Sequence, residues 1–161
     1  MSQPIDRRVV VGHAHLKVSD LDRAVRFYTE VLGFEVTQLY GDQAAFLSAG
    51  GYHHHLGLNT WESRGGRPPA PGTTGLYHVA FLYPDRAAPG KAYRRLMEHS
   101  VPLDGASDHG VSEALYLRDP DGNGIELYCD RPREEWPRNA AGKLQMTTQR
   151  LDLQSLLRAG E

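Results

Sequence analysis

This chain of 161 residues has very little cysteine and no long apolar run. A single cysteine, Cys129, excludes an internal disulfide framework and is typical of a reducing compartment. No apolar stretch approaches the roughly 20 residues needed to span a bilayer, and residues 1–8 lack the apolar centre of a signal peptide. We therefore expect a cytoplasmic globular protein that does not act at a membrane.

An excess of charge of one sign is missing as well. The chain has 18 Lys and Arg against 20 Asp and Glu, a formal charge of −2. This balance argues against nucleic acid or an acidic membrane surface as the main partner. The apolar fraction of 40% is sufficient for one buried core, and it excludes a disordered tail protein or a coiled coil.

Histidine, in contrast, is abundant. The chain has eight histidines, and three of them are consecutive, His53, His54 and His55. These three lie in the middle of the chain within a patterned segment, so an expression tag does not explain them. Histidine-rich tracts are typical of metal binding.

The same order of predicted elements occurs twice along the chain. The first half has a strand, a helix and three strands, at residues 9–18, 21–32, 34–40, 44–48 and 53–58. After a Gly- and Pro-rich loop at 63–75, the order returns at residues 76–83, 89–100, around 103, 113–117 and 125–129. This duplication predicts an α+β fold with one domain over residues 8–130, made of modules at about 8–62 and 75–130.

The remaining segment, residues 131–161, is polar and contains proline, with a short apolar helix predicted at 151–157. Two interpretations are open. The segment is an arm that lies over the domain or reaches a partner, or it is a partly ordered tail.

Alternation along the first strand of each half decides which side chains share a face. In the first half, His13, His15 and Lys17 oppose Ala14, Leu16 and Val18; in the second, His78 and Ala80 oppose Tyr77, Val79 and Phe81. Because the apolar face should pack on the helix of its module, the histidines must line something else. Glu126 and Tyr128 share a face of the last strand in the same way.

The duplication also indicates which polar residues meet. His13 and His78 hold the same place in the two halves, and His55 and Glu126 hold corresponding places on the fourth strands. Two sheets that face each other would bring these residues together. Two imidazoles and a carboxylate with open positions are the set favoured by non-haem Fe(II) oxygenases.

A longer motif supports this interpretation. The segment from Gly12 to Leu21, with Phe27-Tyr28 and Val31-Leu32-Gly33-Phe34, resembles the vicinal oxygen chelate superfamily. That superfamily includes glyoxalase I, extradiol ring-cleavage dioxygenases and antibiotic-resistance proteins, so the resemblance implies a fold more than one activity. Over residues 9–128, it implies two βαβββ modules that form a half-open barrel around a divalent metal.

A second stretch resembles the extradiol dioxygenase signature: His109, Leu115-Tyr116, Asp119-Pro120-Asp121-Gly122 and Glu126. The resemblance implies that His109 is an acid/base beside the metal and that Tyr116 contacts a substrate oxygen. It further implies that Glu126 ligates iron together with His13 and His78, and that His55, with His54, lies beside bound dioxygen. Glyoxalase I carries a glutamate on that strand instead. The chain departs from the pattern at Ser107 and in having one domain where familiar extradiol enzymes have two.

The expected function is therefore oxidative cleavage of a catechol-like aromatic diol by dioxygen. We expect this short form to be a homodimer. Fe(II) is the expected metal, with Mn(II), Zn(II) and Ni(II) as the other candidates. His53, His54 and Tyr128 are the expected substrate contacts, although His53 and His15 are equally well explained as polar walls of the cleft. Two alternatives stay open: a metal-dependent isomerase, lyase or thiol transferase without oxygen uptake, and a drug-binding module without a metal.

Overall fold

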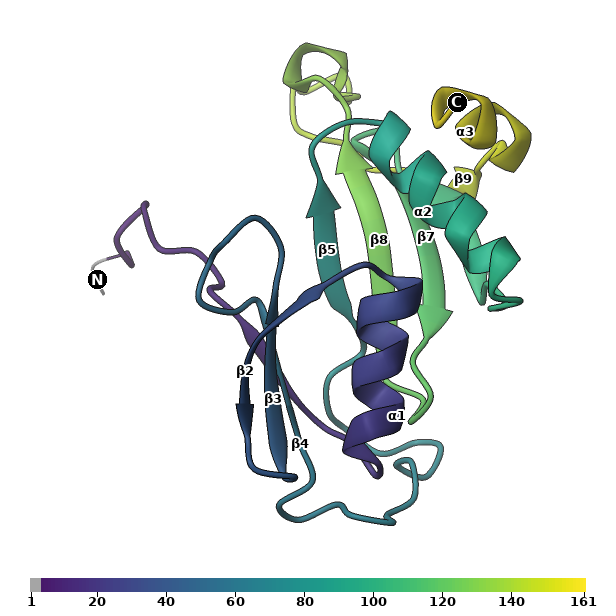
Figure 1. The fold of residues 1–161 in the computed structure, drawn as a ribbon. Helices are drawn as coiled ribbons and strands as arrows, with labels where there is room; N and C mark the ends of the chain where they lie inside the picture. The colour runs from purple at the N-terminus through teal and green to yellow at the C-terminus, as the bar shows by residue number, and fades with distance from the viewer. Residues whose placement is uncertain (1–3) are drawn as a thin grey trace.

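Two separate sheets carry the two halves of the chain in the computed structural model, which describes residues 4–161 (Figure 1). The first sheet has the strand order β1-β4-β3-β2. Its strands are β1 (Ala14–Lys17), β2 (Glu35–Tyr40), β3 (Ala44–Ser48) and β4 (Leu56–Asn59). β1 and β4 are parallel neighbours, and the other pairs are antiparallel.

The second sheet repeats this arrangement and adds one short strand, in the order β5-β8-β7-β6-β9. Its strands are β5 (Val79–Tyr83), β6 (Gly105–Asp108), β7 (Ser112–Arg118), β8 (Gly124–Asp130) and β9 (Gln149–Arg150). β5 and β8 are parallel, as β1 and β4 are. The predicted α+β fold of two βαβββ modules is confirmed, and among the described residues the two sheets do not join into a closed barrel.

The helix of each module follows its first strand. α1 (Leu21–Arg26) begins where the Asp20 carboxylate accepts a hydrogen bond from the Arg23 N–H, and it continues as the π-helical turn η1 (Phe27–Val31). Gly33 ends this helix in a left-handed conformation, with φ at +85°. α2 (Ala87–Glu98) lies along the second sheet (Figure 1). The predicted helices are thus confirmed within two residues at their ends.

α1 and η1 lie between the two sheets and join them into one core (Figure 1). The buried Tyr28 hydroxyl donates to Asp119 Oδ2 in the β7–β8 turn at 3.1 Å. Arg23 Nη2 lies 2.8 Å from Asp121 Oδ1 in the same turn, and the Phe34 and Phe81 rings are 4.9 Å apart between centroids. These contacts fix how the two modules are placed relative to each other.

The segment after β8 is an arm that lies over the second module. It contains η2 (Arg133–Glu135), β9 and α3 (Leu153–Ala159), and β9 pairs with β6. Leu156 of α3 is only 1% exposed and belongs to the core cluster, and α3 packs on α2. The apolar side of the tail helix is therefore used within the chain.

Some strand boundaries differ from the sequence prediction. β1 begins at Ala14 rather than at Val9, and residues 9–11 are exposed. β4 begins at Leu56, so the three consecutive histidines lie in the loop before it. No helix within residues 4–161 is long and apolar enough to cross a membrane.

Candidate metal and acid/base site

The second module brings an imidazole and a carboxylate into contact. His78 directly precedes β5, and Glu126 lies on the parallel neighbour β8, opposite Ala80. His78 Nε2 is 2.9 Å from Glu126 Oε2, and the two side chains are 30% and 13% exposed. His78 Nδ1 is buried and has no hydrogen-bond partner among residues 4–161. Among the described residues, His78 therefore makes its polar contact through Nε2, with the Glu126 carboxylate.

Two further groups extend this pair into a continuous series. Tyr116 of β7 lies directly opposite Glu126, and its hydroxyl, which has a single hydrogen, is within donating distance of Glu126 Oε1 at 3.0 Å. The Tyr116 oxygen is also 2.8 Å from His109 Nε2. His109 Nδ1 in turn lies 2.9 Å from the carbonyl oxygen of Thr147 in the arm. Burial, then the charge of Glu126 and the hydrogen bond to it, raise the pKa of Tyr116 well above its usual value.

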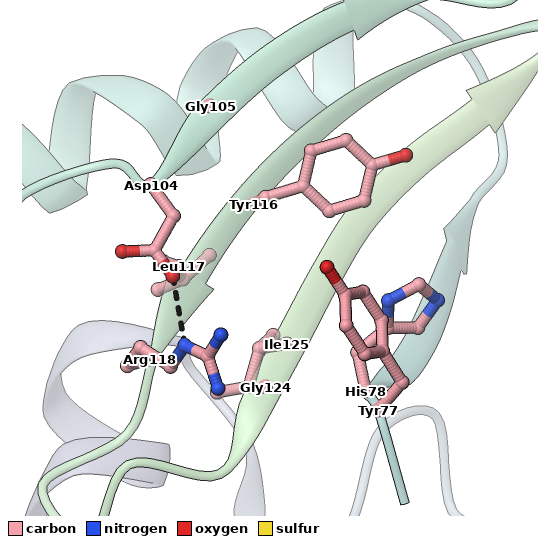
Figure 2. A pocket seen from close by; sticks show the side chains of 9 residues that line it. All are labelled: Tyr77, His78, Asp104, Gly105, Tyr116, Leu117, Arg118, Gly124 and Ile125. Carbon is pink, nitrogen blue, oxygen red and sulfur yellow. Dashed lines mark hydrogen bonds and ion pairs between the residues drawn. The ribbon is translucent and has the colours of Figure 1, made fainter. Parts of the chain in front are cut away.

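A cavity of about 200 Å³ opens beside this series (Figure 2). Figure 2 shows the rings of Tyr77, His78 and Tyr116 on one side and the Arg118–Asp104 ion pair, 2.7 Å long, on the other. Tyr77 was expected on the apolar, packed face, but it is 81% exposed because β5 begins two residues later. Its place beside His78 makes it a cavity residue that the alternation pattern did not predict.

The histidines of the first module form a second, separate group. The rings of His13 and His54 are 4.4 Å apart between centroids, and His53 Nδ1 is 2.7 Å from His54 Nδ1. Burial, followed by the charge of His13 and of the other nearby histidines, lowers the pKa of His54. A neutral imidazole is the form that binds metals and accepts protons.

His55 does not hold the place that the sequence suggested. The register pairs Ala14 with Leu56 and Val79 with Ile125, so the residue equivalent to Glu126 is Gly57. The turn before β4 differs in length from the β7–β8 turn, and this moves the match by two residues. His55 Nδ1 instead lies 3.1 Å from Ser48 Oγ and accepts from the Ala49 N–H. Its ring therefore supports the β3–β4 loop.

The two modules place their large side chain on opposite strands at this register position. His15 pairs with Gly57 in the first module, and Ala80 pairs with Glu126 in the second. In the first module the His15 ring lies across Gly57, where an added Cβ would come within 2.8 Å of the ring. In the second module Ala80 leaves room for Glu126. Each module therefore carries one large and one small residue here, in opposite order.

The structure does not bring His13 to the pair formed by His78 and Glu126. No three His, Cys, Asp or Glu side chains within residues 4–161 are grouped so that they could hold a metal ion. Two of the three predicted ligands meet, and the third, His13, directly precedes β1 of the other sheet. Tyr128, a predicted substrate contact, is half-buried two residues beyond Glu126 on the same face of β8.

Two βαβββ modules, each with a mixed sheet and one helix, are the architecture of the vicinal oxygen chelate proteins. Residues 10–127 match the family model of the glyoxalase/bleomycin resistance protein/dioxygenase superfamily. The chain belongs to this superfamily.

Two sequence relatives of the chain are named as dioxygenases of aromatic diols. A catechol-2,3-dioxygenase of Bacillus subtilis is 46% identical over 147 residues, which cover 91% of this chain and 50% of that protein. Biphenyl-2,3-diol 1,2-dioxygenase 3 of Rhodococcus globerulus is 33% identical over 74% of the chain and 63% of its own length. The chain thus spans only about half to two thirds of these relatives. A glyoxalase/dioxygenase of Nostoc punctiforme shares the fold, with a TM-score of 0.65 at 22% identity over 82% of this chain and 98% of its own.

Proposed function

We propose that this chain is an extradiol dioxygenase that opens the ring of a catechol-like aromatic diol with dioxygen. The observation that carries the proposal is the series from His109 through Tyr116 and Glu126 to His78, with contacts of 2.8, 3.0 and 2.9 Å. It combines an acid/base imidazole, a phenol and two ligand-type groups beside a cavity. The similarity to two ring-cleaving dioxygenases supports the same class.

His78 and Glu126 would hold a divalent metal together with His13. Their donor atoms fit such an ion, because an imidazole nitrogen and a carboxylate oxygen lie side by side and partly shielded from water. Fe(II) is the metal we propose, with Mn(II), Zn(II) and Ni(II) as the other candidates. When bound, iron would supply a Lewis acid for the two substrate oxygens and the one-electron chemistry that dioxygen needs.

The protein groups around this ion would move protons. Tyr116 stays a phenol because its pKa is raised by burial and by Glu126, so it can donate a hydrogen bond at neutral pH. His109 Nε2, 2.8 Å from the Tyr116 oxygen, would take the proton of a substrate hydroxyl and later return one. His53 and His54 would meet a substrate beside His13, and Tyr128 would meet it beside Glu126. His55 has only Nε2 left for the substrate or dioxygen, since the loop engages its Nδ1.

A second copy of the chain would complete the ligand set, so the active form we propose is a homodimer. α1 and η1 fix the two sheets of one chain in an arrangement that keeps His13 from His78 and Glu126. β1 and β5 are both edge strands, and large apolar residues are exposed near them: Val9, Val10, Val11, Leu76, Tyr77 and Leu82. A two-fold dimer would place the first module of one copy against the second module of the other. The cytoplasmic location expected from the sequence stays a prediction.

Anaerobic loading with Fe(II), followed by oxygen-electrode assays on a panel of catechols, tests the activity. We expect one iron per site and oxygen uptake, both lost in Glu126→Ala and both kept in Glu134→Ala, a control acid on η2 outside the site. Metal binding without oxygen uptake on any catechol would favour the isomerase, lyase or transferase alternative. Absence of metal binding would favour the drug-binding module.

Mixing two inactive variants tests the shared site. In a dimer of His13→Ala with Glu126→Ala, one of the two sites has all its ligands, so a random mixture should regain about a quarter of the iron and activity. A mixture that stays inactive, or a monomer in light scattering at all concentrations, would contradict the proposed dimer.

A further inference from the structure

The arm contacts the acid/base histidine through its backbone. The Thr147 N–H donates to the His109 carbonyl oxygen at 3.0 Å, and the Thr147 carbonyl oxygen lies 2.9 Å from His109 Nδ1. Thr148 Oγ1 is a more distant neighbour of the same nitrogen, at 3.4 Å. The next residue, Gly110, has φ at +73°, and a Cβ there would come within 2.8 Å of Pro137. The arm is therefore seated closely on the His109–Gly110 turn.

The arm is held on both sides of Thr147. Before it, Arg131 Nη2 lies 2.6 Å from Asp108 Oδ2 and 2.8 Å from Glu113 Oε1. After it, Arg86 donates to the Ser155 carbonyl oxygen at 3.1 Å while also contacting Glu113 at 2.6 Å. Glu113 is buried and joins the two guanidinium groups. The position of the Thr147 carbonyl is thus fixed by the packing of the whole arm.

A carbonyl oxygen only accepts hydrogen bonds, so the contact with Thr147 requires a proton on His109 Nδ1. In a neutral imidazole the second nitrogen then has no hydrogen and is an acceptor. That nitrogen, Nε2, lies 2.8 Å from the Tyr116 oxygen. Because a phenol has one hydrogen, the Tyr116 hydroxyl donates to Nε2 in this tautomer, and its contact with Glu126 Oε1 at 3.0 Å then has no hydrogen. The arm would therefore decide which nitrogen of His109 is able to accept a proton.

We propose that residues 131–161 are a positioning element, in which the Thr147 carbonyl holds His109 as the Nδ1–H tautomer with Nε2 directed at the site. The inference rests on the proposed acid/base role of His109 for its kinetic consequence, but the tautomer itself is independent of any activity. Thr147 acts through His109 and does not contact the reacting atoms.

Nitrogen NMR of the protein labelled in its histidines measures the tautomer directly. At about pH 9, well above the ordinary histidine pKa of about 6.5, we expect His109 as the Nδ1–H form, with its signals assigned by their loss in His109→Gln. An Nε2–H form in the unmodified protein would overturn the proposal, whether or not the protein cleaves catechols.

Proline substitution then tests the arm. Thr147→Pro removes the N–H that holds this segment to His109, so we expect a mixed tautomer and a reduced kcat with KM and iron content little changed. The loss should not exceed the 10²–10⁴-fold that general acid–base catalysis typically contributes. Met146→Pro is the matched control, because Met146 is exposed and its N–H has no backbone partner in the described part of the chain. Thr147→Pro with the unmodified tautomer and kcat would contradict the proposal. If that variant does not fold, the tautomer of the unmodified protein still decides the matter.

Discussion

Replacing Tyr116 by phenylalanine removes the one oxygen that joins His109 to Glu126. The ring stays, so packing in β7 is kept, but Glu126 Oε1 loses a donor at 3.0 Å and His109 Nε2 loses its neighbour at 2.8 Å. A hydrogen bond to a charged group contributes about 1.5–3 kcal/mol. Tyr116 is partly open to solvent, and screening reduces this value, so we expect a loss of about 1 kcal/mol in unfolding free energy. For a domain of this size that lowers Tm by about 2–4 °C.

The larger effect of Tyr116→Phe should appear in metal binding. Groups that orient a metal ligand typically contribute about 10–100-fold to affinity or activity, and the Tyr116 hydroxyl orients Glu126. Anaerobic titration with Fe(II) measures this affinity, and calorimetry of the metal-free protein measures Tm. Tyr83→Phe is the control, since this half-buried tyrosine of β5 has no hydrogen-bonded hydroxyl within residues 4–161. Iron affinity equal to that of the control would refute the idea that Tyr116 positions Glu126.

Three further changes test the packing around the site. Gly57→Ala should destabilise the chain by about 1–3 kcal/mol in urea unfolding, because the new methyl meets the His15 ring, and adding His15→Ala should restore most of the loss. Leu156→Ala should cost about 2–5 kcal/mol in the same assay, since this α3 side chain is buried in the core; a smaller cost would mean that the arm docks weakly. Burial raises the pKa of Asp108, but the Gly110 N–H and the Arg131 guanidinium outweigh it and hold the pKa below its usual value. This carboxylate therefore stabilises the fold above its unfolded pKa of about 3.9, and the contribution is lost as the pH falls through the lower folded value. Asp108→Asn should flatten that part of the Tm–pH curve, and an unchanged curve would contradict the assignment.

Alternation and duplication in the sequence predicted the parts of the site that lie on neighbouring strands. Leu16 and Val18 are buried while His15 is exposed, as the period of two requires. The contact of His78 with Glu126 follows from the same reasoning, because a parallel strand pair brings both side chains to one face. These relations depend on short-range geometry that a pattern of residues encodes directly.

The features that the sequence did not predict depend on insertions and on long-range packing. Two extra residues in a turn made His55 look equivalent to Glu126, and only the strand register shows that Gly57 is the true match. The separation of His13 from His78 follows from how α1 sits between the sheets, which no local pattern contains. The contact of Thr147 with His109 joins residues 38 positions apart, so the arm could not be assigned a role from composition.

The reversed order of large and small side chains in the two modules limits how such a protein can change its chemistry. A glutamate introduced at Gly57 alone would clash with the His15 ring, since its Cβ would already come within 2.8 Å of ring atoms. A second carboxylate in the first module therefore fits best where residue 15 is small, as Ala80 is beside Glu126. A laboratory library that seeks a new ligand set should vary positions 15 and 57 together.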